Sequence, residues 1–144
     1  MKVITASEAA ELIRDGVTVA GTGFGIIQQP EYLMVAIEDA FARDGHPRGL
    51  TYVHSAGQSD LHGGGLDHLA HEGLLRRVIG GHFRQAVKLG RLILDNALEA
   101  YNFPQGVIAL LYREIAAKRP GLITHAGLGT FVDPRLEGGR MNEC

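Results

Sequence analysis

The chain has 144 residues, 45% of them hydrophobic, and a formal net charge of -2. This length suits one α/β core, and the lack of a basic surplus argues against nucleic acid as a partner. The single cysteine, Cys144, excludes an intrachain disulfide, so we expect a cytoplasmic protein. We expect neither a signal peptide nor a membrane partner, because no apolar run reaches the roughly 20 residues that cross a bilayer.

Strand and helix patterns alternate along the chain. After a short helix that Ser7 caps and Gly16 ends, short apolar runs predict strands over 17–20, 50–56, 77–81, 98–103 and 122–126. Apolar residues at helical spacing predict helices over 31–44, 66–74, 86–97 and 107–118. The first strand should be buried on both faces. This alternation is typical of an α/β fold, a mostly parallel sheet with helices on both faces.

Every predicted strand ends in glycine or small polar residues. These ends are Gly21–Gly25, Ser55–Gln58, Gly80–His82, Pro104–Gly106 and Gly127–Thr130. Ligands of such sheets bind beyond the carboxyl ends of the strands, so we expect the site there. The three glycines of the first loop, followed by a helix that Pro30 opens, suit a cradle of backbone N–H groups for an anion or a carbonyl oxygen.

The first glycine loop, Gly21-Thr22-Gly23-Phe24-Gly25, also invites a dinucleotide interpretation. A Rossmann fingerprint needs G-x-G-x-x-G and an acidic residue at the end of the next strand. Here the third glycine comes one position early, and the next strand ends in His54-Ser55-Ala56-Gly57 without a carboxylate. A structural tight turn and another kind of ligand cradle are the alternatives.

Histidines gather in one part of the sequence: His62, His68 and His71, beside Asp67 and Glu72. The chain has no H-E-x-x-H, and the neighbouring glycines fix no ligand geometry, so we favour hydrogen bonds among these side chains over a metal site.

Three further residues are candidates for chemistry. Glu72 and Asp133 stand in polar, glycine-rich contexts, but neither has an evident base or nucleophile as its partner. Gln105 stands between a strand and a helix N-terminus, where its amide could donate to an oxygen in the cleft or could cap its own helix. From the residues alone, we predict a binding cradle without a recognisable reactive centre.

Several sequence blocks together resemble family I CoA-transferases, close to the short-chain acyl-CoA:carboxylate transferases. The most specific blocks are HLAHEGL, AYNFPQG and GLGTFVDPR, in this order and at these separations. The resemblance covers essentially all of the chain but only the beginning of the family's longer protein. We therefore interpret residues 1–144 as a single N-terminal (alpha-type) domain, truncated at its C-terminus, with the α/β/α sandwich of the NagB/RpiA/CoA-transferase type.

The resemblance implies a ping-pong reaction in which a glutamate carboxylate attacks the acyl-CoA thioester and then carries CoA as a glutamyl thioester. That glutamate belongs to the later half of the family's protein, so we expect no catalytic residue in this chain, and neither Glu72 nor Glu137 takes its place. The substrate-binding residues that the resemblance implies are Gly23, Phe24, Gly25, Gln105 and Gly106. Some relatives have a further glycine where this chain has Gln28.

The same resemblance implies the partners. Coenzyme A would be a substrate, with no other cofactor and no metal, and the acids would be acetate, propionate, butyrate or acetoacetate. We expect a homo-oligomer and a complementary C-terminal half or subunit, which would dock on an exposed apolar surface. The alternative is a non-catalytic remnant that binds a ligand or a protein partner.

Overall fold

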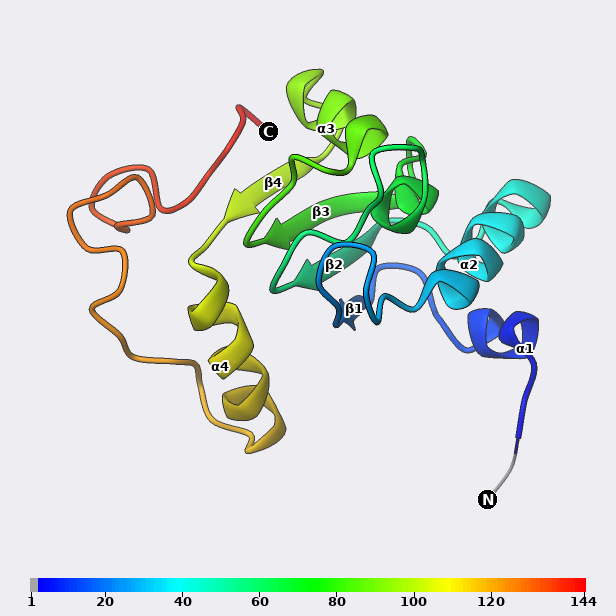
Figure 1. Ribbon diagram of the computed structural model, residues 1–144, viewed down its shortest axis with the longest axis horizontal. Coiled ribbons are helices and arrows are strands. Elements are labelled where there is room, and N and C mark those ends of the chain that lie inside the picture. Colours follow the sequence, from blue (N-terminus) through cyan, green and yellow to red (C-terminus); the bar gives the residue numbers. More distant parts are fainter. Residues whose placement is uncertain (1–2) are drawn as a thin grey trace.

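The computed structural model describes residues 3–144 and contains a four-stranded sheet in which all neighbouring strands are parallel (Figure 1). In chain order, which is also their order in the sheet, the strands are β1 (Thr18–Gly21), β2 (Leu50–His54), β3 (Leu75–Gly80) and β4 (Glu99–Asn102). The helices are α1 (Ala6–Glu11), α2 (Glu31–Asp44), α3 (Val87–Leu94) and α4 (Gln105–Ala116), with a 3-10 helix, η1 (Gly65–Leu69). The predicted α/β class is confirmed.

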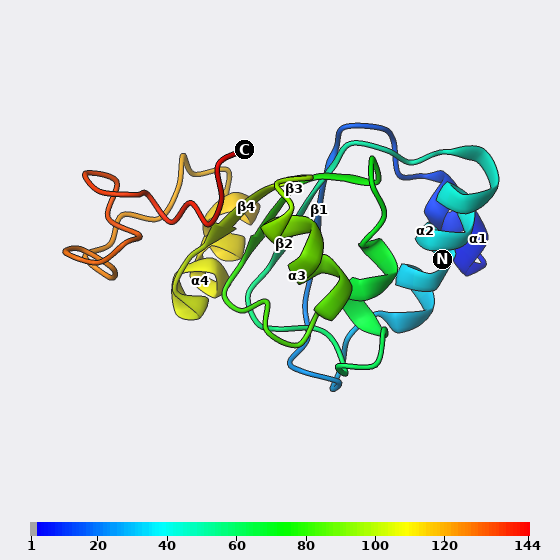
Figure 2. The ribbon, with the colours of Figure 1, turned by 90° about the horizontal axis from the view of Figure 1, so that it is seen from above.

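Helices cover both faces of the sheet. Tyr52 and Val78 belong to the core that also takes in residues of α2, η1 and α3. Val53 and Ile79, their neighbours along the strands, face α4 on the other side. Figures 1 and 2 show α3 and α4 on opposite sides of the sheet. The molecule thus has three layers, as predicted.

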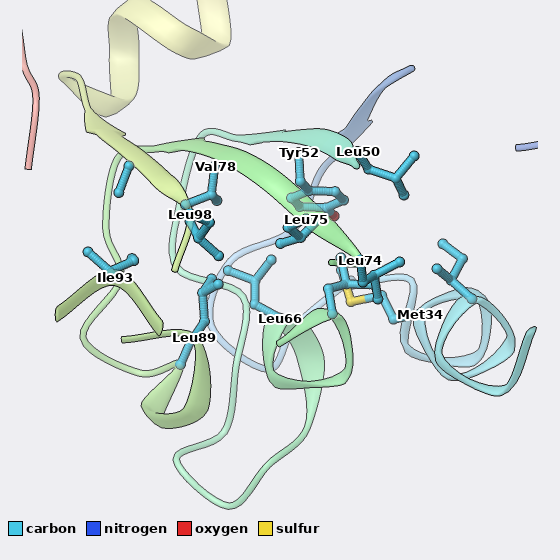
Figure 3. Packing of buried hydrophobic residues seen from close by; sticks show 14 of the residues in the cluster. Met34, Leu50, Tyr52, Leu66, Leu74, Leu75, Val78, Leu89, Ile93 and Leu98 are labelled. Atoms are coloured by element: carbon cyan, nitrogen blue, oxygen red, sulfur yellow. The ribbon is translucent and has the colours of Figure 1, made fainter. Parts of the chain in front are cut away.

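The hydrophobic core lies between the sheet and the layer of α2, η1 and α3. Met34, Leu66 and Leu89, one from each of these elements, are at most 1% exposed and pack toward Tyr52 and Val78 (Figure 3). Full burial of each such aliphatic side chain contributes about 1.5–3 kcal/mol relative to exposure. This packing holds the three elements against one face of the sheet.

The helix over 31–44 is confirmed to the residue. Its periodic apolar face buries Met34, Ile37 and Ala40, whereas Leu33 is 44% exposed. The helix ends because Gly45 adopts a φ of 72°, a left-handed conformation that glycine reaches without steric cost. Pro30 stands immediately before the helix, and its carbonyl oxygen accepts from the N–H groups of Leu33 and Met34.

The predicted cap of the first helix was wrong. Thr5 precedes α1 and accepts a hydrogen bond from the Glu8 N–H, while the Glu8 carboxylate accepts from the Thr5 N–H. This reciprocal capping box satisfies two N–H groups at once, so the helix begins before Ser7. The helix ends at Glu11 and does not extend to Gly16.

Two further elements differ from the prediction. The helix expected over 66–74 is only the 3-10 helix Gly65–Leu69, because β3 already begins at Leu75. The strand expected over 122–126 does not form, and Ile123 is 99% exposed. A strand needs a free sheet edge, and the edge of β4 is already taken by residues 139–142: the Asn102 N–H donates to the Gly139 carbonyl at 2.8 Å.

The other boundaries shift by a few residues. Residues 55–56, 81, 98 and 103 are not in strands, and α3 is shorter at both ends than the predicted 86–97. β1 is not buried on both faces: Thr18 and Ala20 are exposed because β1 is an edge strand. In residues 3–144 no helix has the length and apolar character needed to cross a membrane.

Candidate functional site

The carboxyl ends of the four parallel strands form a common rim. Gly21, His54, Gly80 and Asn102 are the last residues of β1 to β4, and each is followed by a loop. The Asn102 amide donates to the Gly80 carbonyl at 2.9 Å, which ties two of these ends together. We define the rim as these four residues with the loops 22–29, 55–58 and 81–85 and the start of α4.

The predicted glycine turn lies on this rim. Gly23 and Gly25 have φ values of 145° and 59°, and Phe24 pairs with Ile27 through two backbone hydrogen bonds of 2.9 Å. The tight turn leaves Phe24 66% exposed. Gln28 has a φ of 59°, in the region that favours glycine, which explains why a glycine is compatible with this position.

The turn is hydrogen-bonded to the neighbouring loop. The Gly25 N–H donates to the Gly57 carbonyl at 2.6 Å. A Cβ on Gly57 would lie 2.6 Å from Nδ1 of His82 and 2.8 Å from Oε1 of Gln85, so side chains of the next loop pack directly against this glycine. Three loops of the rim are therefore packed one against the next.

Gln105, also predicted, is the first residue of α4 and is exposed. The N-cap is Pro104, and no side chain in the described part of the chain caps the helix, so the interpretation of Gln105 as a cap of its own helix is wrong. A Cβ on Gly81 would lie less than 3.0 Å from the Ser55 carbonyl oxygen and 3.1 Å from the Gln105 Cα. Gly81 thus lets the start of α4 sit directly against the rim.

The remaining predicted residue, Gly106, lies in the first turn of α4 and is exposed. A Cβ there would meet no atom within 4 Å, so packing within the described residues does not require glycine. Gln105 and Gly106 stand at one end of the series of packed loops, and the turn Gly23–Gly25 stands at the other.

Two buried polar side chains, His54 and Gln58, lie beside the rim and were not predicted as site residues. His54 is fully buried, its Nδ1 donates to the Ala56 carbonyl at 2.6 Å, and its Nε2 has no hydrogen-bond partner among residues 3–144. Burial lowers the pKa of His54 to about 4, so the ring is neutral at neutral pH. Gln58 is also fully buried and accepts from the Tyr52 hydroxyl at 3.1 Å. The sequence signal for His54 was its position at the end of the apolar run LTYVH.

Two of the predicted histidines, His68 and His71, lie close together, and both contact carboxylates of α2. His68 places Nε2 2.9 Å from Glu31 and Nδ1 against Glu38, and His71 places Nε2 2.6 Å from the other oxygen of Glu38. Burial lowers the pKa of His68, but the hydrogen bonds to Glu38 and Glu31 outweigh it and raise the pKa above its usual value. Burial raises the pKa of Glu38, but the bonds from His71 and His68 outweigh it and lower the pKa.

The two histidines are hydrogen-bonded to carboxylates, as we favoured, but the carboxylates are Glu31 and Glu38 and not the neighbouring Asp67 and Glu72. Glu31 also accepts from the Gly65 N–H at 2.9 Å and from the Gln29 amide at 3.0 Å, so the network joins η1 to the end of the glycine loop. His62 is exposed and lies outside it. Within residues 3–144 no group of three or more histidine, cysteine, aspartate or glutamate side chains is arranged to hold a metal ion.

The remaining candidate carboxylates are held by structural hydrogen bonds or lie away from the rim. Asp67 is fully buried and accepts from the N–H groups of Val87, Lys88 and Leu89 at 2.9–3.1 Å, which caps α3. Asp133 accepts from Arg135, whose hydrogen bonds hold the pKa of that carboxyl well below its usual range. Glu72 precedes β3 and is therefore at the amino ends of the strands, across the sheet from the rim.

The donors on the rim belong to Gln105 and to the start of α4. The Gln105 amide is exposed and the first N–H groups of α4 stand at a helix N-terminus, whereas in the glycine turn the Phe24 and Gly25 N–H groups already donate to the Ile27 and Gly57 carbonyls. Helix N-termini and amide groups stabilise oxygen atoms that carry partial negative charge. This arrangement suits a carbonyl, thioester or carboxylate oxygen.

Comparisons with known proteins agree in family and fold. The family model described as coenzyme A transferase matches residues 3–142. The chain is 48% identical over 142 residues to the caffeate CoA-transferase of Acetobacterium woodii, covering 99% of this chain and 27% of that protein. It is 34% identical over 133 residues to one subunit of a probable succinyl-CoA:3-ketoacid coenzyme A transferase of Bacillus subtilis, covering 91% of this chain and 52% of that subunit.

A solved structure gives the same fold. The acyl-CoA transferase YdiF of Escherichia coli, solved as a thioester complex with CoA, superimposes with a TM-score of 0.93 at 38% identity. The match covers 97% of this chain and 29% of that protein. The chain thus spans little more than a quarter of the single-chain relatives and about half of the Bacillus subtilis subunit.

Proposed function

This chain belongs to the coenzyme A transferase family, and we propose that it is the N-terminal, substrate-binding part of an enzyme that moves CoA between carboxylic acids. The reaction begins when a glutamate carboxylate, supplied from outside this chain, attacks the acyl-CoA carbonyl and releases the CoA thiolate. The thiolate then attacks the glutamyl carbonyl of the resulting anhydride, which frees the first acid and leaves a glutamyl-CoA thioester. A second carboxylic acid takes over the CoA by the reverse steps.

Gln105 is the donor that we assign to the thioester oxygen. The observation that carries the assignment is its position as the uncapped first residue of α4, exposed at the carboxyl ends of the strands and set against Gly81. A preorganised donor of this kind stabilises a developing oxyanion by about 3–4 kcal/mol, or roughly 10²–10³ in kcat. The turn Gly23-Phe24-Gly25 and Gly106 complete the acyl-binding surface in this proposal.

One relative is named a caffeate CoA-transferase and another an acetate CoA-transferase. The carboxylic acid that this protein uses therefore has to be tested. We propose short-chain acids such as acetate, propionate, butyrate and acetoacetate, as the resemblance implied. Propionate and caffeate are therefore the two acceptors to compare, each with acetyl-CoA as the donor.

The experiment measures CoA transfer by this chain alone and after addition of the part of YdiF that lies outside the match. Turnover only in the mixture is the expected result, and turnover by the chain alone would refute the assignment of the nucleophile to another segment. In the active mixture, Gln105→Ala should lower kcat about 10²-fold or more. Arg113→Ala, at an exposed position on the same helix, is the matched control and should leave kcat unchanged. Binding of acyl-CoA without turnover in any mixture would instead favour the non-catalytic remnant.

A further inference from the structure

The last residue of β2 is flanked by glycine on both sides. The parallel register places His54 opposite Gly21 of β1 and Gly80 of β3. A Cβ on Gly80 would lie less than 3.0 Å from two atoms of the His54 ring. On the other side, a Cβ on Gly21 would overlap the Tyr52 hydroxyl group. The two glycines thus leave room for two polar side chains of β2, both at most 2% exposed.

Both of these side chains hydrogen-bond to the loop after β2, which comprises residues 55–58. Tyr52 and His54 are two residues apart on the strand and therefore share one face of the sheet. The His54 Nδ1 donates to the Ala56 carbonyl at 2.6 Å. The Tyr52 hydroxyl donates to the side-chain oxygen of Gln58 at 3.1 Å. The loop is therefore held at two positions that a single residue separates.

The contact with the loop determines the tautomer of His54. A carbonyl oxygen only accepts hydrogen bonds, so Nδ1 carries the proton of the neutral ring and Nε2, which faces Gly80, carries none. Burial lowers the pKa of His54 to about 4, so the ring is neutral at neutral pH. The donor to Ala56 is therefore present under the conditions of an assay.

The residue between the two anchored positions is Gly57, whose carbonyl accepts from the Gly25 N–H at 2.6 Å. At its other end, the loop packs through the Ser55 carbonyl oxygen against Gly81, which in turn borders the Gln105 Cα. The loop after β2 thus contacts the glycine turn on one side and the surroundings of the thioester donor on the other. Its position sets the spacing between them.

We propose that His54 and Tyr52 are positioning residues for CoA transfer: by holding the loop after β2, they set the distance between the turn Gly23–Gly25 and Gln105. Both side chains are buried and act through the loop without touching acyl-CoA. A displacement of about 1 Å, caused far from the reacting atoms, can lower turnover roughly 10²-fold. The effect on turnover rests on the proposed function, whereas the effect on the turn does not.

The first test follows amide hydrogen exchange of the full 144-residue chain by NMR. His54→Leu removes the donor to Ala56 and should speed exchange of the Gly25 N–H about tenfold or more, because its acceptor is no longer held in place. His54→Asn carries an amide nitrogen on Cγ, as the imidazole carries Nδ1, and should restore slow exchange. The Phe24 N–H, which donates to Ile27 within the turn itself, should change little and is the internal control. Unchanged exchange at Gly25 in His54→Leu would overturn the inference.

A second variant separates positioning from a general loss of stability. Ile93→Ala leaves a cavity in the same core and keeps every hydrogen bond of the loop after β2. It should lower the urea midpoint but leave exchange at Gly25 close to the parent rate. If Ile93→Ala accelerates Gly25 as much as His54→Leu does, stability alone explains the effect and the inference is wrong.

Tyr52→Phe takes the place of His54→Leu if the latter does not fold. It deletes only the hydroxyl group that binds Gln58, so exchange at Gly25 should be about 2–10-fold faster, as expected for the loss of one hydrogen bond. An unchanged rate in this variant would equally overturn the inference.

The ring itself provides a spectroscopic test. A long-range proton–nitrogen correlation spectrum of the full chain at neutral pH should show Nδ1 of His54 protonated and Nε2 unprotonated. Protonation at Nε2 alone would mean that Nδ1 does not donate to Ala56, which would contradict the positioning role.

Kinetics in the active mixture with the YdiF part distinguish this inference from the proposed function. His54→Leu should lower kcat about tenfold or more with little change in the KM for acyl-CoA, and His54→Asn should recover most of the kcat. CoA transfer with equal kcat in the parent and His54→Leu would overturn the inference and leave the proposed function in place. Faster exchange at Gly25 without CoA transfer in any mixture would refute the proposed function and leave the control of the turn in place.

Discussion

Replacement of Gly81 by alanine tests the packing that places α4 on the rim. The new methyl group would lie less than 3.0 Å from the Ser55 carbonyl oxygen, a distance that real Cβ contacts do not show, and 3.1 Å from the Gln105 Cα. Both neighbours are backbone atoms, so the clash cannot be relieved by rotation of a side chain. Overpacking of this kind costs about 1–3 kcal/mol. We expect the free energy of unfolding to fall by that amount.

A second glycine provides the control. Gly90 lies inside α3, and a Cβ there would meet no atom of the described residues within 4 Å. Alanine is favoured over glycine in a helix interior, so Gly90→Ala should raise the free energy of unfolding by about 0.5–1 kcal/mol. The two Gly→Ala variants should therefore differ by roughly 1.5–4 kcal/mol, with opposite signs relative to the parent.

Urea unfolding of the full chain, followed by far-UV circular dichroism, measures both variants. In the active mixture with the YdiF part, Gly81→Ala should also lower kcat, since a displacement of about 1 Å at a positioning residue can cost 10²-fold. A Gly81→Ala variant at least as stable as the parent would refute the argument that this contact positions α4.

Three more predictions concern the cap, the histidine network and the site. Asp67→Ala leaves three N–H groups of α3 without their acceptor and should cost about 2–3 kcal/mol in urea unfolding, whereas exposed Asp95→Ala should cost under about 0.5. Because the folded pKa of His68 is raised, its stabilisation is complete below the unfolded value near 6.5 and is lost as pH rises through the folded pKa. His68→Asn should therefore cost more stability at pH 6 than at pH 9, and an equal loss at both would contradict the ion-pair account. Gly106→Ala should not lower stability, but it should reduce CoA transfer in the active mixture if acyl-CoA approaches the backbone there.

The sequence predicts best where local pattern and packing agree. The helix over 31–44 has a periodic apolar stripe and is followed by a glycine. It forms with the predicted bounds and ends at that glycine. The strand over 122–126 has an equally apolar sequence but no free edge beside it, since residues 139–142 lie along β4. Whether an apolar run becomes a strand depends on a partner far away in the chain, which a local pattern does not contain.

Neighbours within the candidate site also depend on segments that are far apart in the chain. The strand–turn–helix pattern placed Gln105 at the end of a strand, and parallel strands bring such ends together. The contact between Gly81 and Ser55 depends on the order of strands in the sheet, and so does the burial of His54 beside Gly80. That order is a property of the whole chain, so these neighbours could not be inferred from spacing.

Because β1 is an edge strand, its free side determines where the site would stand in a larger sheet. From β1 to β4 the chain winds in one direction only, and residues 139–142 close the far side. A strand added on the free side reverses the winding at β1. Such reversal points leave a crevice outside the carboxyl ends of the strands, where open α/β sheets bind their ligands. The turn Gly23–Gly25, now at the margin of the sheet, would then lie at its centre, flanked by protein on both sides.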